Sequence, residues 1–408
     1  MVKVLLVTQW FDPEPTFKGM LFAKSLVEKG FEVEVLTGFP NYPTGKIYAG
    51  YKIKLIDKKI IDGVTVTRLP LYPSHDSSIL KRALNYISYA ASATIYGVFF
   101  AKKPNIIYAY HPPITVGIAA ALIKFFRRTP LIYDIQDLWP DTLKATGMVS
   151  NQCILKLIGK ICAFIYQSAT HLVVLSPGFK KILIARGVPE NKIDLIYNWA
   201  DESKLQNSTG LLPKNFPSKD KFKIVFAGNI GRAQALNTVL QTCEILEKTH
   251  SLIHFVIVGN GIALKELKEK AIIMNLSNLT FIPAVPMSDV GVILNAADVL
   301  LVHLNNDPLF EITIPSKTQA YMVAGKPILM GVKGDAAELV LLAKCGLTFE
   351  PQNASELVKN AELLSLKSEN ELNKMGENAR IFYEKHLSLE VGVSKFAKIF
   401  TEKVTQKT

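Results

Sequence analysis

Residues 222–236 read FKIVFAGNIGRAQAL, and this stretch decides the fold of the second half of the chain. A mostly apolar run is followed by a loop with two glycines, Gly228 and Gly231, and then by a helical pattern. Continuous apolar runs are typical of parallel strands that helices cover on both faces. The stretch therefore predicts a strand, a glycine loop and a helix, which together begin a doubly wound sheet.

The same pattern recurs along the whole chain, and helix-length segments follow the apolar runs. In the second half the further runs are IHFVIVG (253–259), LTFIPA (279–284), DVLLVHL (298–304) and PILMGV (327–332). In the first half they are VKVLLVT (2–8), FEVEVLT (31–37), NIIYAY (105–110), PLIYDI (130–135) and HLVVLS (171–176). Two such series predict an α/β protein with two doubly wound parallel-sheet, Rossmann-like domains facing a cleft. Ligands are expected outside the carboxyl ends of the strands.

The domain boundaries follow from changes in composition. The polar segment 201–221, with Pro, Gly, Ser and Asn but little periodicity, predicts a linker. The first domain is then 1–200 and the second is 222–385. Residues 386–408 predict a C-terminal helix, for which a return to the first domain is one option.

The net charge of +12 is concentrated in residues 1–200, which hold 24 Lys and Arg against 13 Asp and Glu. Residues 201–408 hold 23 against 22. A basic half attracts anions such as phosphorylated ligands or an acidic membrane. No nucleic-acid partner is expected, because the basic residues neither interleave with an aromatic platform nor form a reader motif.

The cysteines and the N-terminus bear on the compartment. Cys153, Cys162, Cys243 and Cys345 have no paired spacing, which favours a reducing compartment without a metal site or a disulfide framework. The N-terminal apolar run is too short for a signal peptide and is expected to form a strand.

Three places in the first half could carry chemistry. Gly19 precedes a predicted helix, where it either admits a phosphate to the helix N-terminus or only makes a turn. The segment QDLWPD (136–141) follows a strand, and its Asp137 could bind sugar hydroxyls or act as a base, whereas Asp141 suits a helix cap. His111 follows another strand and is either a cleft residue or a structural histidine.

The glycine loops of the second half predict a phosphate-binding site. Gly228 and Gly231 let a ligand approach the backbone, and Arg232 supplies charge. A second loop, after the strand at 253–259, contains Gly259 and Gly261. Two such loops in one domain favour nucleotide binding over simple turns.

The block FEITIPSKTQAYMVAGKPIL (310–329) is the densest group of candidates. Pro315 and Ser316 suit a helix start, which places Lys317 and Gln319 at the positive end of a helix dipole. A diphosphate could rest there, and Glu311 in the preceding loop could bind sugar hydroxyls.

Together these motifs resemble a family 4 glycosyltransferase of the GT-B architecture over essentially the full length. The likeness rests on segments in the family's order, namely the loop ending in Gly19, QDLWPD, VVLSPGFKKIL (173–183), IYNWAD (196–201), AGNIGRAQAL (227–236), IVGNG (257–261), AADVLLVHL (296–304) and the block from Glu311 to Gly325. QDLWPD, GNIGRAQAL and IPSKTQAYMVAGKPIL are most similar to bacterial transferases that place N-acetyl-L-fucosamine or related amino sugars during surface polysaccharide assembly.

The resemblance implies retaining transfer from a nucleotide sugar, expected to be UDP-linked, to a glycan or lipid-linked acceptor, without a cofactor or an obligatory metal. The departing phosphate would accept the proton of the acceptor. The amides after Ile314, with Lys317 and Arg232, would stabilise the charge on that phosphate.

The chain departs from the family pattern at four positions. The Arg and Lys that normally hold the donor phosphates correspond to Asn229 and Gln234, so Arg232 is expected to substitute for them. The family's second glutamate corresponds to Gln319, and the His before the first-domain acid corresponds to Gln136. An epimerase of the same architecture and a non-catalytic nucleotide- or glycan-binding protein remain as alternatives.

Bulky apolar and basic residues mix in three first-half segments, at 79–103, 123–128 and 153–166. The longest is barely long enough to span a bilayer and contains polar residues. The sequence predicts a face that rests on anionic headgroups through residues 79–128. The expected location is therefore cytoplasmic and peripheral to the inner face of the cell membrane.

Overall fold

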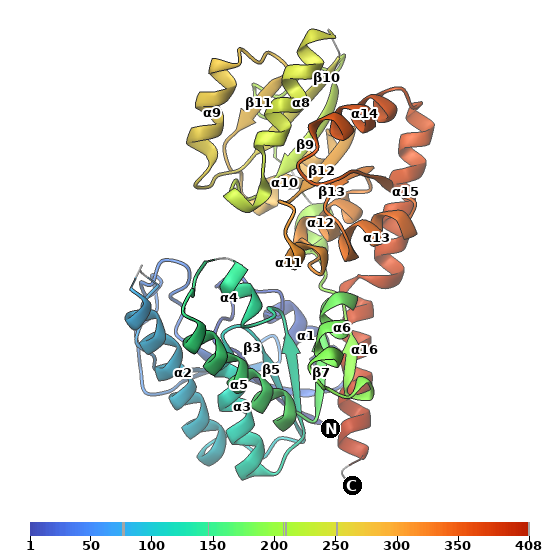
Figure 1. Cartoon of the computed structure of the whole chain (residues 1–408). Helices are drawn as coiled ribbons and strands as arrows, with labels where there is room; N and C mark the ends of the chain where they lie inside the picture. Colours follow the sequence, from blue (N-terminus) through green and yellow to red (C-terminus); the bar gives the residue numbers. More distant parts are fainter. Residues whose placement is uncertain (76–77, 146, 207, 209, 250–251, 407–408) are drawn as a thin grey trace. The chain divides into compact units, whose positions relative to one another are not determined.

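The computed structural model describes residues 1–75, 78–145, 147–206, 208, 210–249 and 252–406 (Figure 1). The chain divides into two compact units. One comprises Met1–Tyr197 and Leu389–Thr408, and the other comprises Asn198–Ser388. Each unit is an α/β domain with one mainly parallel sheet, which confirms the predicted fold class.

The sheet of the first unit has the order β3-β4-β2-β1-β5-β6-β7-β8. Its strands are β1 (Lys3–Val7), β2 (Glu32–Gly38), β3 (Asp57–Ile61), β4 (Val64–Leu69), β5 (Ile106–Tyr110), β6 (Leu131–Ile135), β7 (His171–Val174) and β8 (Ile193–Leu195). Its helices are α1 (Met20–Glu28), α2 (Ile79–Phe99), α3 (Ile114–Arg127), α4 (Asp141–Ala145), α5 (Gln152–Ser168), α6 (Pro177–Ala185) and α16 (Leu389–Thr405). The central strands are buried on both faces, as their apolar runs predict.

One strand departs from the expected parallel arrangement. β3 is antiparallel to β4, and the two join through Asp62 and Gly63, whose φ angles are 48° and 79°. Two residues with positive φ form the tight turn that a β-hairpin needs. The other side of β3 is the edge of the sheet, which explains its largely exposed, lysine-containing sequence.

The C-terminal helix α16 belongs to the first unit. Its Phe396 contacts the rings of Phe22 and Tyr108, with centroids 5.2 and 5.3 Å apart. Phe400 packs edge-on against Phe31 at 6.0 Å. α16 therefore covers one face of the first sheet together with α1, whereas α2, α3 and α5 lie side by side on the other (Figure 1).

The sheet of the second unit has the order β11-β10-β9-β12-β13-β14, and its paired strands are parallel. Its strands are β9 (Phe222–Ala227), β10 (Ile253–Val258), β11 (Leu279–Ile282), β12 (Val299–His303), β13 (Ile328–Gly331) and β14 (Gly346–Thr348). Its helices are α7 (Glu202–Gln206), α8 (Asn237–Lys248), α9 (Leu264–Ile273), α10 (Met287–Asn295), α11 (Pro308–Glu311), α12 (Ser316–Ala324), α13 (Asp335–Leu342), α14 (Ala354–Ser365) and α15 (Glu369–His386).

The segment 201–221, for which we expected a linker, is part of this second unit. Its helix α7 packs against α10 and α12. The polar composition of the segment reflects its place at the surface of the unit, and the chain passes between the units at Tyr197–Asn198 and Ser388–Leu389.

Candidate functional site

Two predicted donor-site residues of the second unit, Gly228 and Lys317, lie against each other. Gly228 follows β9 with a φ of 141°, and a Cβ on it would come within 3.2 Å of the Lys317 ammonium nitrogen. That nitrogen also lies 3.5 Å from the centroid of the Phe226 ring. Burial lowers the pKa of Lys317 to about 7. The end of β9 thus carries a poorly solvated amine next to a glycine.

The second glycine loop packs onto the first, backbone against backbone. A Cβ on Gly259 would lie 1.9 Å from the Gly228 carbonyl oxygen, and one on Gly261 would lie 2.3 Å from that of Ile230. The Ile230 amide donates to the Asn260 carbonyl at 2.8 Å. Gly259 and Gly261 are therefore needed to hold the two loops together, and this packing alone accounts for their missing side chains.

The loop after β9 is held by its own polar side chains. The Gly231 amide donates to the Gln234 side-chain oxygen at 2.9 Å, so part of the Gln234 amide is occupied within the loop. Asn229 and Arg232 are exposed. Of the predicted phosphate ligands in this loop, Arg232 is the cation that a ligand in solvent can reach.

His303, at the end of β12, supports this loop and was not singled out from the sequence. Its Nδ1 lies 2.8 Å from the Gln234 carbonyl oxygen, and the Gln352 amide donates to its Nε2 at 3.1 Å. Nε2 therefore accepts and Nδ1 carries the proton, which is the neutral form, and burial lowers the His303 pKa. Strand DVLLVHL predicted the position of His303, but its partners lie 49 and 69 residues away.

Helix α12 begins where the IPSK segment predicts. Ile314 is buried, Pro315 is the N-cap and Ser316 is exposed. The Thr318 amide donates to the Pro315 carbonyl at 2.9 Å, whereas the first amides of a helix generally have no partner within it and can bind an anion. Gln319 is only 2% exposed, and its amide nitrogen, turned toward the acceptors, donates to the carbonyls of Pro315 and Ser316 at 2.9 and 3.2 Å. Gln319 thus holds the first turn of the helix.

Glu311 ends the short helix α11 and is exposed. Its backbone is fixed by Gly334, because a Cβ on Gly334 would lie 2.0 Å from the Glu311 carbonyl oxygen. Glu311 is therefore an exposed carboxylate whose backbone packs closely against Gly334, and its binding of sugar hydroxyls stays a prediction.

In the first unit, a carboxylate of the protein itself already binds the helix start at Gly19. The Met20 amide donates to the Asp12 carboxylate at 2.6 Å, and a Cβ on Gly19 would lie 2.1 Å from the same oxygen. Gly19 therefore makes room for a carboxylate of this chain, which supports the structural alternative for this glycine.

The QDLWPD segment follows β6 and packs against His111. His111 is 2% exposed, burial lowers its pKa to about 3, and the Asp137 amide donates to its Nδ1 at 3.4 Å. Its ring packs edge-on against Trp139, with centroids 5.4 Å apart. His111 is thus a neutral residue that positions this segment. Asp137 itself is half-buried, and burial raises its pKa.

Buried polar side chains surround Asp134, three residues before Asp137 in the sequence. The Asp134 carboxylate accepts from Tyr108 and Gln136, each at 2.6 Å. The charge of buried Lys18 opposes the effect of burial on the Asp134 pKa, which is nonetheless raised. Gln136, at the position of the family's histidine, therefore holds a buried acid. Asp141 begins α4 and pairs with Arg186.

Aromatic side chains follow the first strands of this sheet, and the sequence analysis did not single them out. Trp10 and Tyr42 stack with centroids 4.6 Å apart, and His75 packs edge-on against Tyr42 at 4.8 Å. Beneath them, buried Asn85 accepts from the Gln9 amide at 2.5 Å and donates to Asn41 at 3.2 Å. The sequence signal that could have revealed this aromatic group is the position of Trp10, shortly after the end of a predicted strand.

Both units thus carry polar and aromatic groups after the carboxyl ends of parallel strands, an arrangement typical of enzymes that bind nucleotides and sugars. Family comparison assigns both halves. Residues 20–199 match the glycosyl transferase 4-like domain, and residues 210–382 match the glycosyl transferases group 1 domain. The chain is therefore a glycosyltransferase with one domain of each kind.

Known proteins agree with this assignment. The chain is 24% identical to the probable glycosyltransferase WbjE of Pseudomonas aeruginosa over 79% of its length and 81% of that protein. It is 26% identical to WcaI of Escherichia coli K12, assigned as a colanic acid biosynthesis glycosyl transferase, over 80% and 83%. Anabaena HepE, solved with UDP and glucose, shares the GT-B fold with a TM-score of 0.69, 15% identity and coverage of 98% and 100%.

Proposed function

We propose that this glycosyltransferase moves a sugar from a UDP-linked donor to a lipid-linked glycan in bacterial surface polysaccharide biosynthesis, with retention at the anomeric carbon. WcaI, whose name refers to colanic acid, and HepE, solved with UDP and glucose, support the pathway class and the donor class. The IPSKTQAYMVAGKPIL likeness favours N-acetyl-L-fucosamine or a related amino sugar as the transferred group.

The contact between Lys317 and Gly228 is the observation that carries the donor site. A diphosphate beside Gly228 would meet the Lys317 ammonium and the first amides of α12. Its negative charge would raise the pKa of Lys317, which burial lowers, and so stabilise the protonated ammonium. Arg232 adds charge from the solvent side, and Glu311 binds hydroxyls of the sugar. These groups would take over the role of the Arg and Lys that hold the donor phosphates in the family. In this chain, Asn229 and Gln234 occupy the positions of that Arg and Lys.

The reaction needs few further groups. The bond between the anomeric carbon and the diphosphate oxygen breaks while the acceptor oxygen forms its bond on the same face. The departing phosphate takes the acceptor's proton. Lys317, Arg232 and the α12 amides stabilise the negative charge that grows on that phosphate.

The donor site is tested by thermal unfolding with UDP. UDP at a hundred times its dissociation constant should stabilise the protein by about 2.7 kcal/mol. Lys317→Met should lose most of this shift, whereas the matched control Lys359→Met, an exposed lysine of the same unit, should keep it. An unchanged shift in Lys317→Met would remove Lys317 from the donor site.

We place the acceptor at the first unit, with Asp137 near its reacting hydroxyl and the Trp10–Tyr42 stack against its sugar rings. Aromatic faces suit the apolar faces of sugars. Trp10→Ala should raise the KM for the acceptor and leave the KM for the donor unchanged. Equal effects on both constants would show that Trp10 acts only through the fold.

We also propose that α2, α3 and α5 attach the protein to the cytoplasmic face of the membrane. Phe99, Phe100, Phe125, Phe126 and Phe164 are each more than half exposed. Lys102, Lys103 and Arg128 lie at the ends of α2 and α3. None of the helices in the described part of the chain combines the length and the apolar character that crossing a membrane requires.

Arg127 has a different role from its basic neighbours. Its guanidinium donates to the carbonyls of Val98 at 3.1 Å and Ala101 at 2.5 Å, so it ties α3 to the end of α2. We therefore exclude Arg127 from the variant that tests membrane binding.

Co-sedimentation with phosphatidylglycerol-containing vesicles tests the attachment. Replacing Lys102, Lys103 and Arg128 with Ser should cost about 1 kcal/mol each, or roughly a hundredfold in partitioning at low salt. The control variant replaces Lys265, Lys359 and Lys385 of the second unit, which are equally exposed. Equal partitioning of the two variants would contradict this face.

A further inference from the structure

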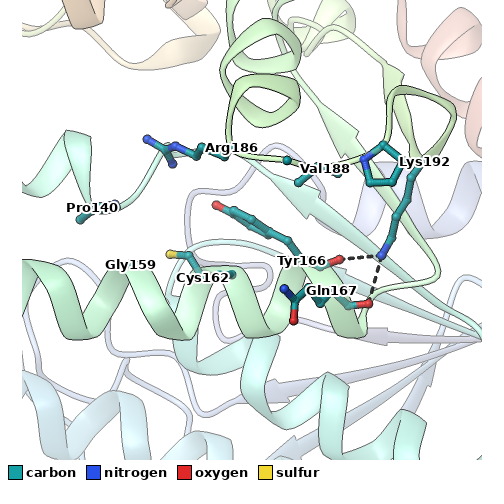
Figure 2. A pocket seen from close by; sticks show the side chains of 11 residues that line it. Pro140, Gly159, Cys162, Tyr166, Gln167, Arg186, Val188 and Lys192 are labelled. Atoms are coloured by element: carbon teal, nitrogen blue, oxygen red, sulfur yellow. Dashed lines mark hydrogen bonds between the residues drawn. The ribbon is translucent and has the colours of Figure 1, made fainter.

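A groove of about 480 Å³ lies in the first unit between α5 and the loop after α6 (Figure 2). Gly159, Cys162 and Tyr166 line it from α5, and residues 186–189 form the facing wall. Figure 2 shows Pro140 toward one end of the groove and Lys192 toward the other. The proposed donor and acceptor sites do not use this groove.

Gly159 keeps the groove open. Among the described residues, an added Cβ would meet only Pro140 Cγ, at the ordinary contact distance of 3.9 Å, and the backbone of Gly159 is not left-handed. A glycine inside a helix costs stability relative to alanine. Neither packing nor backbone conformation requires this glycine, and a large side chain in its place would enter the groove.

A basic side chain lies at each end of the groove. At one end, the Arg186 guanidinium pairs with Asp141 and donates to the Trp139 carbonyl at 3.3 Å. At the other, the Lys192 ammonium donates to the carbonyls of Tyr166 and Gln167 at 2.7 and 3.1 Å. The charge of Arg186 is offset by Asp141, whereas Lys192 uses two of its three N–H groups on carbonyls and can still bind an anion with the third.

The middle of the groove is lined by apolar groups, which include Ala163, Val188 and Pro189. Burial and the charge of Lys124 lower the pKa of Lys192, so an anion would stabilise its protonated form. An ammonium at one end of an apolar trough complements an amphiphile with an anionic head.

The groove lies within the helical layer to which α3 and α5, which we propose face the membrane, belong. α3, α5 and α6 connect successive neighbours in the order β5-β6-β7-β8, and right-handed crossovers place them on one face of the sheet. Ile154, Leu157 and Phe164, which are exposed on α5, continue the apolar surface of α2 and α3.

We propose that this groove binds the phosphate headgroup and upper acyl chain of one anionic phospholipid. The proposal rests on the membrane attachment proposed above and adds a saturable lipid site to it. The bound lipid would contact Pro140, within the QDLWPD segment that carries Asp137.

Calorimetric titration of the whole protein with dioctanoyl phosphatidylglycerol, below its micelle concentration, tests the site without vesicles or nucleotide. We expect saturable binding of one lipid, at least tenfold weaker binding of dioctanoyl phosphatidylcholine, and no measurable binding of inorganic phosphate. If inorganic phosphate binds as well as the lipid, the groove is an anion site and the proposal is wrong.

Gly159→Leu fills the groove and should weaken phosphatidylglycerol binding at least tenfold. Ser355→Leu, which places the same side chain at an exposed position of α14 in the second unit, should leave it unchanged. If Gly159→Leu does not fold, Lys192→Gln decides, with the same tenfold loss expected. Undiminished binding in a folded groove variant overturns the proposal, while vesicle co-sedimentation and sugar transfer, measured separately, still report on the proposed function.

Discussion

The pH dependence of nucleotide binding tests Lys317 in detail. Burial places the pKa of Lys317 at about 7 in the unliganded protein, and a bound diphosphate should raise it. Binding is then coupled to proton uptake above pH 7. UDP is a suitable probe, because a phosphate group with its second pKa near about 6 is largely ionised between pH 7.0 and 8.5.

The magnitude follows from this pKa. If the pKa in the complex lies well above 8.5, the affinity for UDP should fall between pH 7.0 and 8.5 by about fifteenfold, or about 1.6 kcal/mol. At pH 7 the amine is half protonated, so its protonation below pH 7 should add at most about a twofold gain before the affinity levels off. The sign is opposite to that of a carboxylate ligand, which would lose affinity as the pH falls.

Isothermal titration of UDP at several pH values, with two variants, makes the measurement specific. Lys317→Arg keeps its charge throughout this range, so its affinity should be flat whatever its absolute value. Lys317→Met should bind weakly and also without a pH trend. A wild-type slope that persists in Lys317→Met would assign the titration to another group and refute the reasoning.

Three further changes are expected to have measurable effects. Glu311→Gln should lower turnover at least about tenfold, or 1.4 kcal/mol, with an unchanged melting temperature; near-normal turnover in the folded variant would remove Glu311 from the donor site. Arg232→Ala should lower kcat more than it raises the donor KM, because phosphate charge grows in the transition state, and a change in KM alone would make Arg232 an ordinary binding residue. Gly259→Ala should destabilise the second unit by about 2–4 kcal/mol in denaturant unfolding, since its Cβ would strike the Gly228 carbonyl at a φ of 146°. Gly50→Ala, which has positive φ but nothing within 4 Å, is its control and should cost less; equal costs would show that backbone strain alone matters.

The sequence best predicted the strands that are buried along their whole length. β9, β10 and β12 lie at the predicted runs, because a strand covered on both faces must be apolar along its length. The β3–β4 hairpin was missed, because an exposed edge strand carries charge and lacks that signal. The boundary at Tyr197–Asn198 and the packing of α16 depend on contacts hundreds of residues apart, which local composition does not record.

In the candidate site, too, features set by the local sequence were predicted, and features set by distant contacts were not. The IPSK motif predicted the start of α12 and the position of Lys317, since capping is local. The helix start at Gly19 and the side chain of Gln319 form hydrogen bonds with nearby residues of the same loop or turn. Only the structure shows that these bonds already use the groups that a ligand was expected to bind. His303 and the Trp10–Tyr42 stack involve residues that are distant in sequence, so the pattern of any one segment could not reveal them.

Sugar transfer itself is the most direct test of the central claim. The protein is incubated with UDP-linked amino sugars and a bacterial lipid extract, UDP release is followed, and the anomeric configuration of the product is read by NMR. We expect UDP release that requires both donor and lipid, and a product that keeps the donor's anomeric configuration. A donor epimer formed without acceptor would identify an epimerase, and no turnover of any nucleotide sugar that binds would identify a non-catalytic binding protein; either result would contradict this account.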